Sequence, residues 1–219
     1  RAKLRVEIGK GSPKEIFDEI EQICISQRIN VNDFTDESLK KFLVDNNIGI
    51  DCSGYAYNVY NSLSQSLNKG SLDKNIKFTD SKGLLGKLRG MIRPVENTNV
   101  ETLADNKNSK LIKINDIQVG DMITMLKNSG QGQRNHILII YQVEYQNFKP
   151  IKIHYTHSIA WPSHGEYNHG VKDGTIEIID SEKNIIDQRW IEDQKIGDEN
   201  YTFSSAKNSI TEIRRLNFL

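Results

Sequence analysis

The chain has 219 residues, of which 37% are hydrophobic, and its 29 basic and 29 acidic side chains give a net charge of zero. This length and apolar content can bury one sizeable core, so one elaborated domain is expected. The balanced charge supplies no basic field and argues against a nucleic-acid partner. The longest apolar run is strand-sized, far below the roughly 18 residues of a membrane span, so no transmembrane segment is predicted.

Two helices are predicted before residue 50. The first, over about 13–26, follows from Ser12-Pro13-Lys14-Glu15, which combines an N-cap serine, a proline at the first helical position and a glutamate three residues after the cap. Thr35 begins the second by the same capping logic, and Asn46-Asn47 with Gly49 ends it. Residues 1–48 are therefore expected to form a helical lead-in packed on the core of a domain spanning 49–219.

The remainder of the chain divides into a helix, a polar insertion and a series of strands. A third helix is predicted from Cys52, because apolar residues recur after it at three- and four-residue steps. Residues 68–110 are polar and are interpreted as an insertion with one short helix. Short β-rich runs follow at residues 112–117, 122–123, 137–141, 151–155, 176–179 and 210–216. Helices first and antiparallel strands afterwards indicate an α+β fold with segregated elements.

Cys52 is the candidate nucleophile, because Asp51-Cys52-Ser53-Gly54 lies where a loop becomes a helix. The thiolate is the reactive form of cysteine, and a helix N-terminus with a nearby imidazolium is expected to lower the thiol pKa. His136 opens an apolar strand, which would hold it rigidly as the base. Cys24 lies in an apolar helical run and is expected to be an inert, unpaired thiol.

A third polar residue should orient His136, and both His154 and His157 lie near the next strand. Strand alternation places His157 on the face of Ile153 and Tyr155, so His157 is preferred and His154 remains the alternative. Four of the five histidines fall between residues 154 and 169, and a cluster of histidines can bind zinc. No cysteine pair or helical His-Glu pattern accompanies them, so neither a metal nor a cofactor is expected.

These motifs, in this order, resemble the NlpC-type cell-wall peptidases of the papain-like superfamily. The resemblance covers about residues 50–160 and rests on Asp51 to Tyr55 at a helix start, Gly120 to Ile123 at a strand start, and His136 and His157. It implies a papain-like fold and hydrolysis of amide bonds in peptidoglycan stem peptides through a thioester. It also implies a secreted or cell-envelope location, although no signal sequence is recognised within this chain.

Candidate substrate contacts surround the predicted nucleophile. The resemblance assigns the substrate's amino end to Asp51 and Ser53, and Tyr55 completes that motif. Trp161 opens a polar and aromatic loop that is expected to line or cover the cleft. Two alternatives remain: an acyltransferase or deamidase using the same site, and a non-catalytic module that binds cell-wall peptides or glycans.

Overall fold

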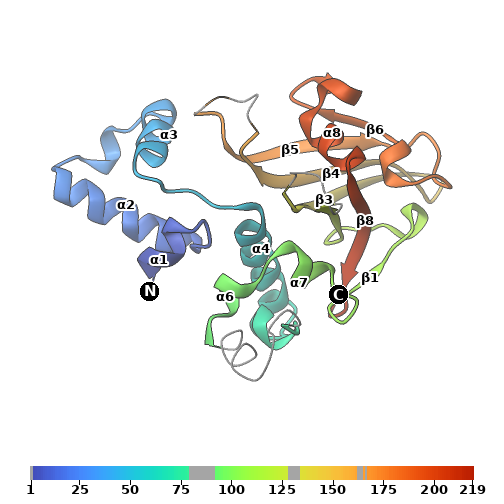
Figure 1. Ribbon diagram of the computed structural model, residues 1–219, viewed down its shortest axis with the longest axis horizontal. Coiled ribbons are helices and arrows are strands. Elements are labelled where there is room, and N and C mark those ends of the chain that lie inside the picture. Colours follow the sequence, from blue (N-terminus) through green and yellow to red (C-terminus); the bar gives the residue numbers. More distant parts are fainter. Residues whose placement is uncertain (1, 79–91, 128–133, 162–164, 166) are drawn as a thin grey trace.

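The computed structural model describes the chain except residues 1, 79–91, 128–133, 162–164 and 166 (Figure 1). The helices before residue 50 lie at one side of the molecule and the sheet at the other, with α4 (Cys52–Ser66) between them, whereas α8 (Tyr201–Lys207) lies beside the sheet. The predicted mixture of helix and antiparallel sheet is confirmed. Among the described residues, none of the helices is long and apolar enough to cross a membrane.

The described residues before 50 form three α-helices, α1 (Ala2–Glu7), α2 (Pro13–Gln27) and α3 (Asp36–Asp45), and one 3₁₀ helix, η1 (Val31–Asp33). Both capping predictions are confirmed, since the Ser12 and Thr35 side chains each accept the backbone N–H three residues later in a capping box. α3 ends where Asn47 adopts a positive φ of 54°. The sequence analysis did not predict α1, which has only six residues.

The N-terminal helices bury a hydrophobic cluster of their own. It contains Val6, Ile20, Cys24, Phe42 and Ile48, apart from the two clusters at the sheet. The turn after α1 then meets α4. The Asp51 N–H donates to the Gly9 carbonyl at 2.8 Å, and the Asn58 amide donates to the Gly11 carbonyl at 3.0 Å.

The described residues form one eight-stranded antiparallel sheet with the order β1-β8-β2-β3-β4-β5-β6-β7. The strands are β1 (Ser109–Leu111), β2 (Met122–Lys127), β3 (His136–Gln146), β4 (Lys149–Ile159), β5 (Gly170–Glu177), β6 (Arg189–Glu192), β7 (Lys195–Ile196) and β8 (Ser209–Leu216). β3 and β4 pair through Ile139 with Thr156 and Ile140 with Tyr155. This register brings the start of β3 beside the end of β4.

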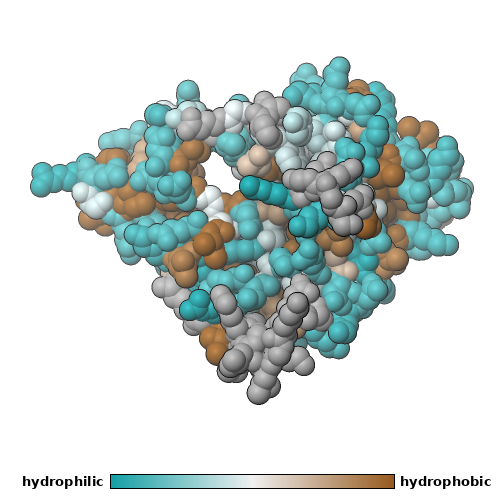
Figure 2. Space-filling model, in the orientation of Figure 1, coloured by the Kyte–Doolittle hydropathy of each residue, from teal (hydrophilic) through white to brown (hydrophobic). Residues whose placement is uncertain are grey.

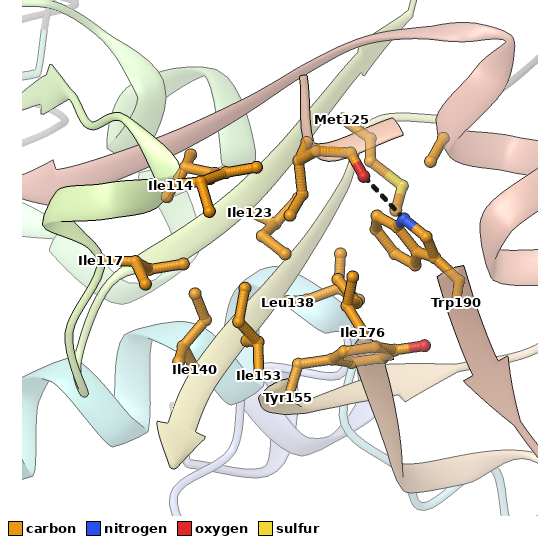
Figure 3. Packing of buried hydrophobic residues seen from close by; sticks show 13 residues of the cluster. Ile114, Ile117, Ile123, Met125, Leu138, Ile140, Ile153, Tyr155, Ile176 and Trp190 are labelled. Atoms are coloured by element: carbon orange, nitrogen blue, oxygen red, sulfur yellow. Dashed lines mark hydrogen bonds between the residues drawn. The ribbon is translucent and has the colours of Figure 1, made fainter. Parts of the chain in front are cut away.

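Both faces of the sheet are covered at β3, which explains why its first half is continuously apolar. Ile137 and Ile139 pack with residues of α4 (Cys52–Ser66), whereas Leu138 and Ile140 point into the other cluster with Trp190 (Figure 3). Successive side chains of a strand alternate between faces, so a strand covered on both sides needs apolar residues at every position. The same burial holds His136 at the mouth of β3.

Some element predictions were wrong. The run at 112–117 is no strand: β1 ends at Leu111 and a 3₁₀ helix, η3 (Ile114–Asp116), follows. Asn115-Asp116 favours a turn, while Ile114 and Ile117 still reach the core. The described part of 68–110 holds η2 (Leu72–Lys74), α6 (Pro94–Asn97) and α7 (Val100–Ala104) rather than one short helix. β6, β7 and the seven-residue α8 (Tyr201–Lys207) were not predicted.

Candidate active site

Cys52 is the first residue of α4, as the sequence predicted. The N-cap is Asp51, whose side chain accepts the backbone N–H of Gly54. Asp51 satisfies the Gly54 N–H, and the N–H groups of Cys52 and Ser53, which precede it in the first turn, lie at the N-terminal end of the helix beside the thiol. Gly54 is required here, because a Cβ at this position would overlap the carbonyl oxygen of Gly9. The candidate nucleophile thus lies where the N-terminal segment docks on α4.

His136 and His157 meet at the ends of their strands. His136 Nε2 lies 2.7 Å from His157 Nδ1, and both side chains are buried. The strand-parity argument that preferred His157 agrees with this geometry. His154 points elsewhere, with its Nε2 2.6 Å from Glu144 Oε1. The structure therefore pairs His136 with His157.

Glu192 extends this pair into a buried chain, which the sequence analysis missed. Its Oε2 lies 3.0 Å from His157 Nε2 and accepts the Tyr155 hydroxyl at 2.8 Å, while its Oε1 accepts the Thr202 hydroxyl at 2.9 Å. Trp190 and Glu192 are both buried on one face of β6. The sequence signal that could have identified Glu192 was its position two residues after Trp190. Side chains at this spacing in a strand point to the same face, so a core tryptophan directs the glutamate inward as well.

Trp161 connects the hydrogen-bonded residues Glu192, His157 and His136 to the cleft. Its indole N–H donates to the Thr202 hydroxyl at 3.0 Å, and its ring centroid lies 5.2 Å from that of His136. Thr202 in turn binds Glu192. Trp161 therefore packs against His136, the candidate base, and contacts Glu192 indirectly through Thr202.

The hydrogen-bond chain selects one tautomer for each histidine. A carboxylate can only accept, so His157 Nε2 carries a hydrogen and His157 Nδ1 is an acceptor. His136 must then donate from Nε2, which leaves its Nδ1 lone pair free. Cys52 Sγ lies 3.9 Å from the carbonyl oxygen of Asn135, the residue before His136, and both Cys52 and His136 line one cleft. The arrangement leaves a proton acceptor on the ring that shares the cleft with the thiol.

Cys52 and His136 are both uncharged at rest, contrary to the thiolate expected from the sequence. Burial raises the pKa of Cys52 from 9.0 to about 11; Asp51 adds to this rise, and the charge of Lys10 opposes it. Burial, followed by the nearby His157, lowers the pKa of His136 well below 6.5. Burial alone would raise the pKa of Glu192, but the hydrogen bond from His157, with those from Tyr155 and Thr202, lowers it overall. At neutral pH the pair is a thiol and a neutral imidazole.

Lys10 is a second feature that the sequence analysis missed. Its buried ammonium donates to the Ser53 hydroxyl and, at 2.8 Å, to the Thr98 carbonyl, and it lies 3.4 Å from Asp51 Oδ1. Burial lowers the pKa of Lys10, and the Asp51 carboxylate opposes that shift. Lys10, just beyond α1, therefore contacts both side chains that flank Cys52 in the sequence.

One cleft of about 850 Å³ brings together most of the predicted site residues. Asp51, Cys52, Ser53, His136 and Trp161 all line it. The Ser53 hydroxyl is already engaged by Lys10 and donates to Asp51 Oδ1 at 3.1 Å.

The remaining predicted motifs lie outside this cleft. Tyr55 is not among its described lining residues; its hydroxyl meets Thr156 Oγ1 at 3.2 Å. Asp121 pairs with Arg215 at 2.6 Å and so supports the sheet. Within the described part of the chain, no three His, Cys, Asp or Glu side chains are placed to hold a metal ion. His164 lies outside the described residues.

No family model, no curated protein and no solved structure matches this chain. Function is therefore inferred from the geometry of the cleft and the chemistry of the residues that line it.

Proposed function

We propose that this chain is a cysteine hydrolase that cleaves amide bonds through a thioester on Cys52. The observation that carries the proposal is the buried chain from Glu192 through His157 to His136, which leaves a proton-accepting nitrogen on a ring that shares the cleft with Cys52. A nucleophile, a base and a group that orients the base are the parts that acyl transfer requires. The first turn of α4 adds backbone N–H donors for the oxyanion.

The neutral resting pair determines how the first step proceeds. Cys52 Sγ attacks the substrate carbonyl while its proton passes to His136 Nδ1, so the thiolate forms during the attack rather than before it. The positive charge that develops on His136 is stabilised through His157 by the buried carboxylate of Glu192. His136 then gives the proton to the departing amine, which leaves the acyl group on sulfur.

Hydrolysis completes the cycle through the same residues. His136, neutral again, takes a proton from water as the water oxygen attacks the thioester carbonyl. Collapse of this intermediate breaks the carbon–sulfur bond, and the proton returns to Cys52. The carboxylic acid product then leaves, and no redox partner is needed for the balance.

A papain-like fold and peptidoglycan stem peptides as substrate, with a cell-envelope location, belong to the same proposal. They are supported by the order of the motifs and by the packing of α4 on an antiparallel sheet with the nucleophile at its N-terminus. Asp51 suits the amino end of such a peptide, because its carboxylate is partly exposed at the cleft.

The test compares Cys52→Ala with Cys24→Ala, since Cys24 is buried in the N-terminal cluster away from the cleft. Purified stem peptides and activated esters serve as substrates, and mass spectrometry of the quenched protein detects an acyl adduct. We expect turnover and an adduct with the Cys24 variant and neither with the Cys52 variant. Full turnover by Cys52→Ala would overturn the assignment.

A further inference from the structure

The cleft continues from the candidate nucleophile onto the N-terminal helices, where its lining changes character. Near Cys52 the lining is polar, with His136, Asn135 and Ser158. Farther along, aliphatic side chains predominate beside Glu7, Lys40 and Asn47; Ile8, Ile16, Leu43, Val44, Ile48 and Ile50 form what we call the apolar wall. Figure 2 shows hydrophobic side chains bordering the opening between these helices and the sheet.

Part of the apolar wall is not needed to hold the N-terminal helices together. Ile8 and Val44 are absent from the hydrophobic cluster of these helices, and Ile8 is 44% exposed. Aliphatic side chains that face an open cleft and pack on no core are typical of a ligand site. The wall therefore offers binding energy to an apolar group that enters the cleft.

The wall is continuous with the chemistry. Ile50 precedes Cys52 by two residues, and Ile159 and Ala160, just before Trp161, line the same cleft. An apolar group seated here can be attached directly to the carbonyl that Cys52 attacks. A peptide brings an N–H and a C=O with every residue, and these groups need hydrogen-bond partners when they are buried. A hydrocarbon chain has no such groups, so it can be buried against aliphatic side chains without hydrogen bonds.

We propose that the apolar wall binds an aliphatic acyl chain, so that the group carried on Cys52 is of the fatty-acyl type. This inference rests on the proposed thiol hydrolase and selects its substrate class. It differs from the polar stem peptides that the sequence resemblance implies, so the two substrate classes can be compared in one experiment.

The experiment measures kcat/KM for p-nitrophenyl esters from acetyl to decanoyl, kept below their micelle concentrations, with stem peptides as a separate arm. We expect kcat/KM to rise with chain length by up to about fourfold for each methylene that becomes buried. In Val44→Ser and Ile8→Ser the ratio of decanoyl to acetyl kcat/KM should fall by roughly threefold or more. Ile25→Ser is the matched control, because Ile25 is 77% exposed on α2 and lies outside the cleft lining.

A second measurement separates the inference from the proposed function: calorimetric binding of decanoate and hexanoate to the Cys52→Ala protein. If decanoate binds more strongly than hexanoate and the difference is lost in the Val44→Ser background, the apolar wall binds aliphatic chains, even if no ester is hydrolysed. Cys52-dependent hydrolysis that is indifferent to chain length, or that is confined to stem peptides, overturns the fatty-acyl inference and leaves the hydrolase standing. Absence of both turnover and chain-length-dependent binding overturns both.

Discussion

Glu192 and His157 lie 3.0 Å apart at the buried end of the chain that reaches His136, with side-chain exposures of 4% and 0%. Three donors converge on the Glu192 carboxylate, from His157, Tyr155 and Thr202. A buried carboxylate satisfied in this way stays ionised, and it therefore dictates which His157 nitrogen carries the hydrogen. The geometry makes Glu192 a positioning residue for the candidate base.

Replacing Glu192 with glutamine should lower kcat while changing KM little. The amide can donate to His157 Nε2 and so favour the wrong tautomer, which removes the acceptor that His136 needs. We expect kcat to fall by at least about tenfold, because a histidine held in the wrong tautomer cannot serve as the base. The measurement is steady-state kinetics with an activated ester, together with ¹⁵N spectra of the histidine rings.

Glu144→Gln is the matched control, because Glu144 forms the same kind of pair with His154 at the sheet surface. It should retain the turnover of the unsubstituted protein. If both variants turn over equally, Glu192 has no positioning role.

The capped helices and the apolar strands could be predicted from the sequence because their signals are local. Ser12 and Thr35 bond within one turn of chain, and β3 shows its two buried faces as a continuous apolar run. The parity of β4 was enough to choose His157 over His154.

The contacts that complete the site are non-local, and no spacing rule reveals them. Lys10 meets Ser53 across 43 residues, and Glu192 meets His157 across 35. The pKa of Cys52 was misjudged for the same reason. The helix N-terminus is visible in the sequence, whereas the burial that outweighs it depends on what packs around the thiol.

Alkylation of native Cys52 by iodoacetamide should be slow at pH 8 and should accelerate up to about pH 11. A raised pKa keeps the proton on sulfur, so the thiolate fraction grows about tenfold for each pH unit below 11. Peptide mass spectrometry after timed quenching separates Cys52 from Cys24. Urea-unfolded protein is the control, and at pH 8 its Cys52 should react roughly a hundredfold faster. A native rate that levels off near pH 8 would contradict the neutral resting pair.

Lys10→Met should raise the pKa of Cys52 further. The positive charge of Lys10 lowers the pKa of Cys52 and opposes the effect of Asp51. Without that charge, burial and the Asp51 carboxylate raise the pKa further. We expect alkylation of native Cys52 at pH 9 to slow by about threefold or more. Lys14→Met removes an exposed lysine paired with Asp18 and should leave the rate unchanged. Equal rates in both variants would show that Lys10 has no electrostatic effect on the thiol.

Gly54→Ala should separate the N-terminal segment from the nucleophile. The new Cβ would overlap the Gly9 carbonyl and crowd Asp51 and Lys10, so the turn after α1 must shift away from α4. We expect the free energy of unfolding to fall by about 2 kcal/mol or more, the range for overpacking a close contact. Urea denaturation followed by circular dichroism gives this value, and the m-value shows whether a single transition persists.

Gly49→Ala provides the comparison, because nothing lies within 4 Å of a Cβ at Gly49 and no positive φ is recorded there. It should change the free energy of unfolding by no more than about 0.5 kcal/mol, or raise it slightly by restricting the unfolded chain. If Gly54→Ala is equally benign, the Gly9 contact does not hold the N-terminal segment on α4. Gly54 lies in the helix that carries Cys52, in contact with Gly9 of the N-terminal segment. If Gly54→Ala is destabilising and also slows turnover, the docking of residues 1–50 on this helix is needed to form the cleft.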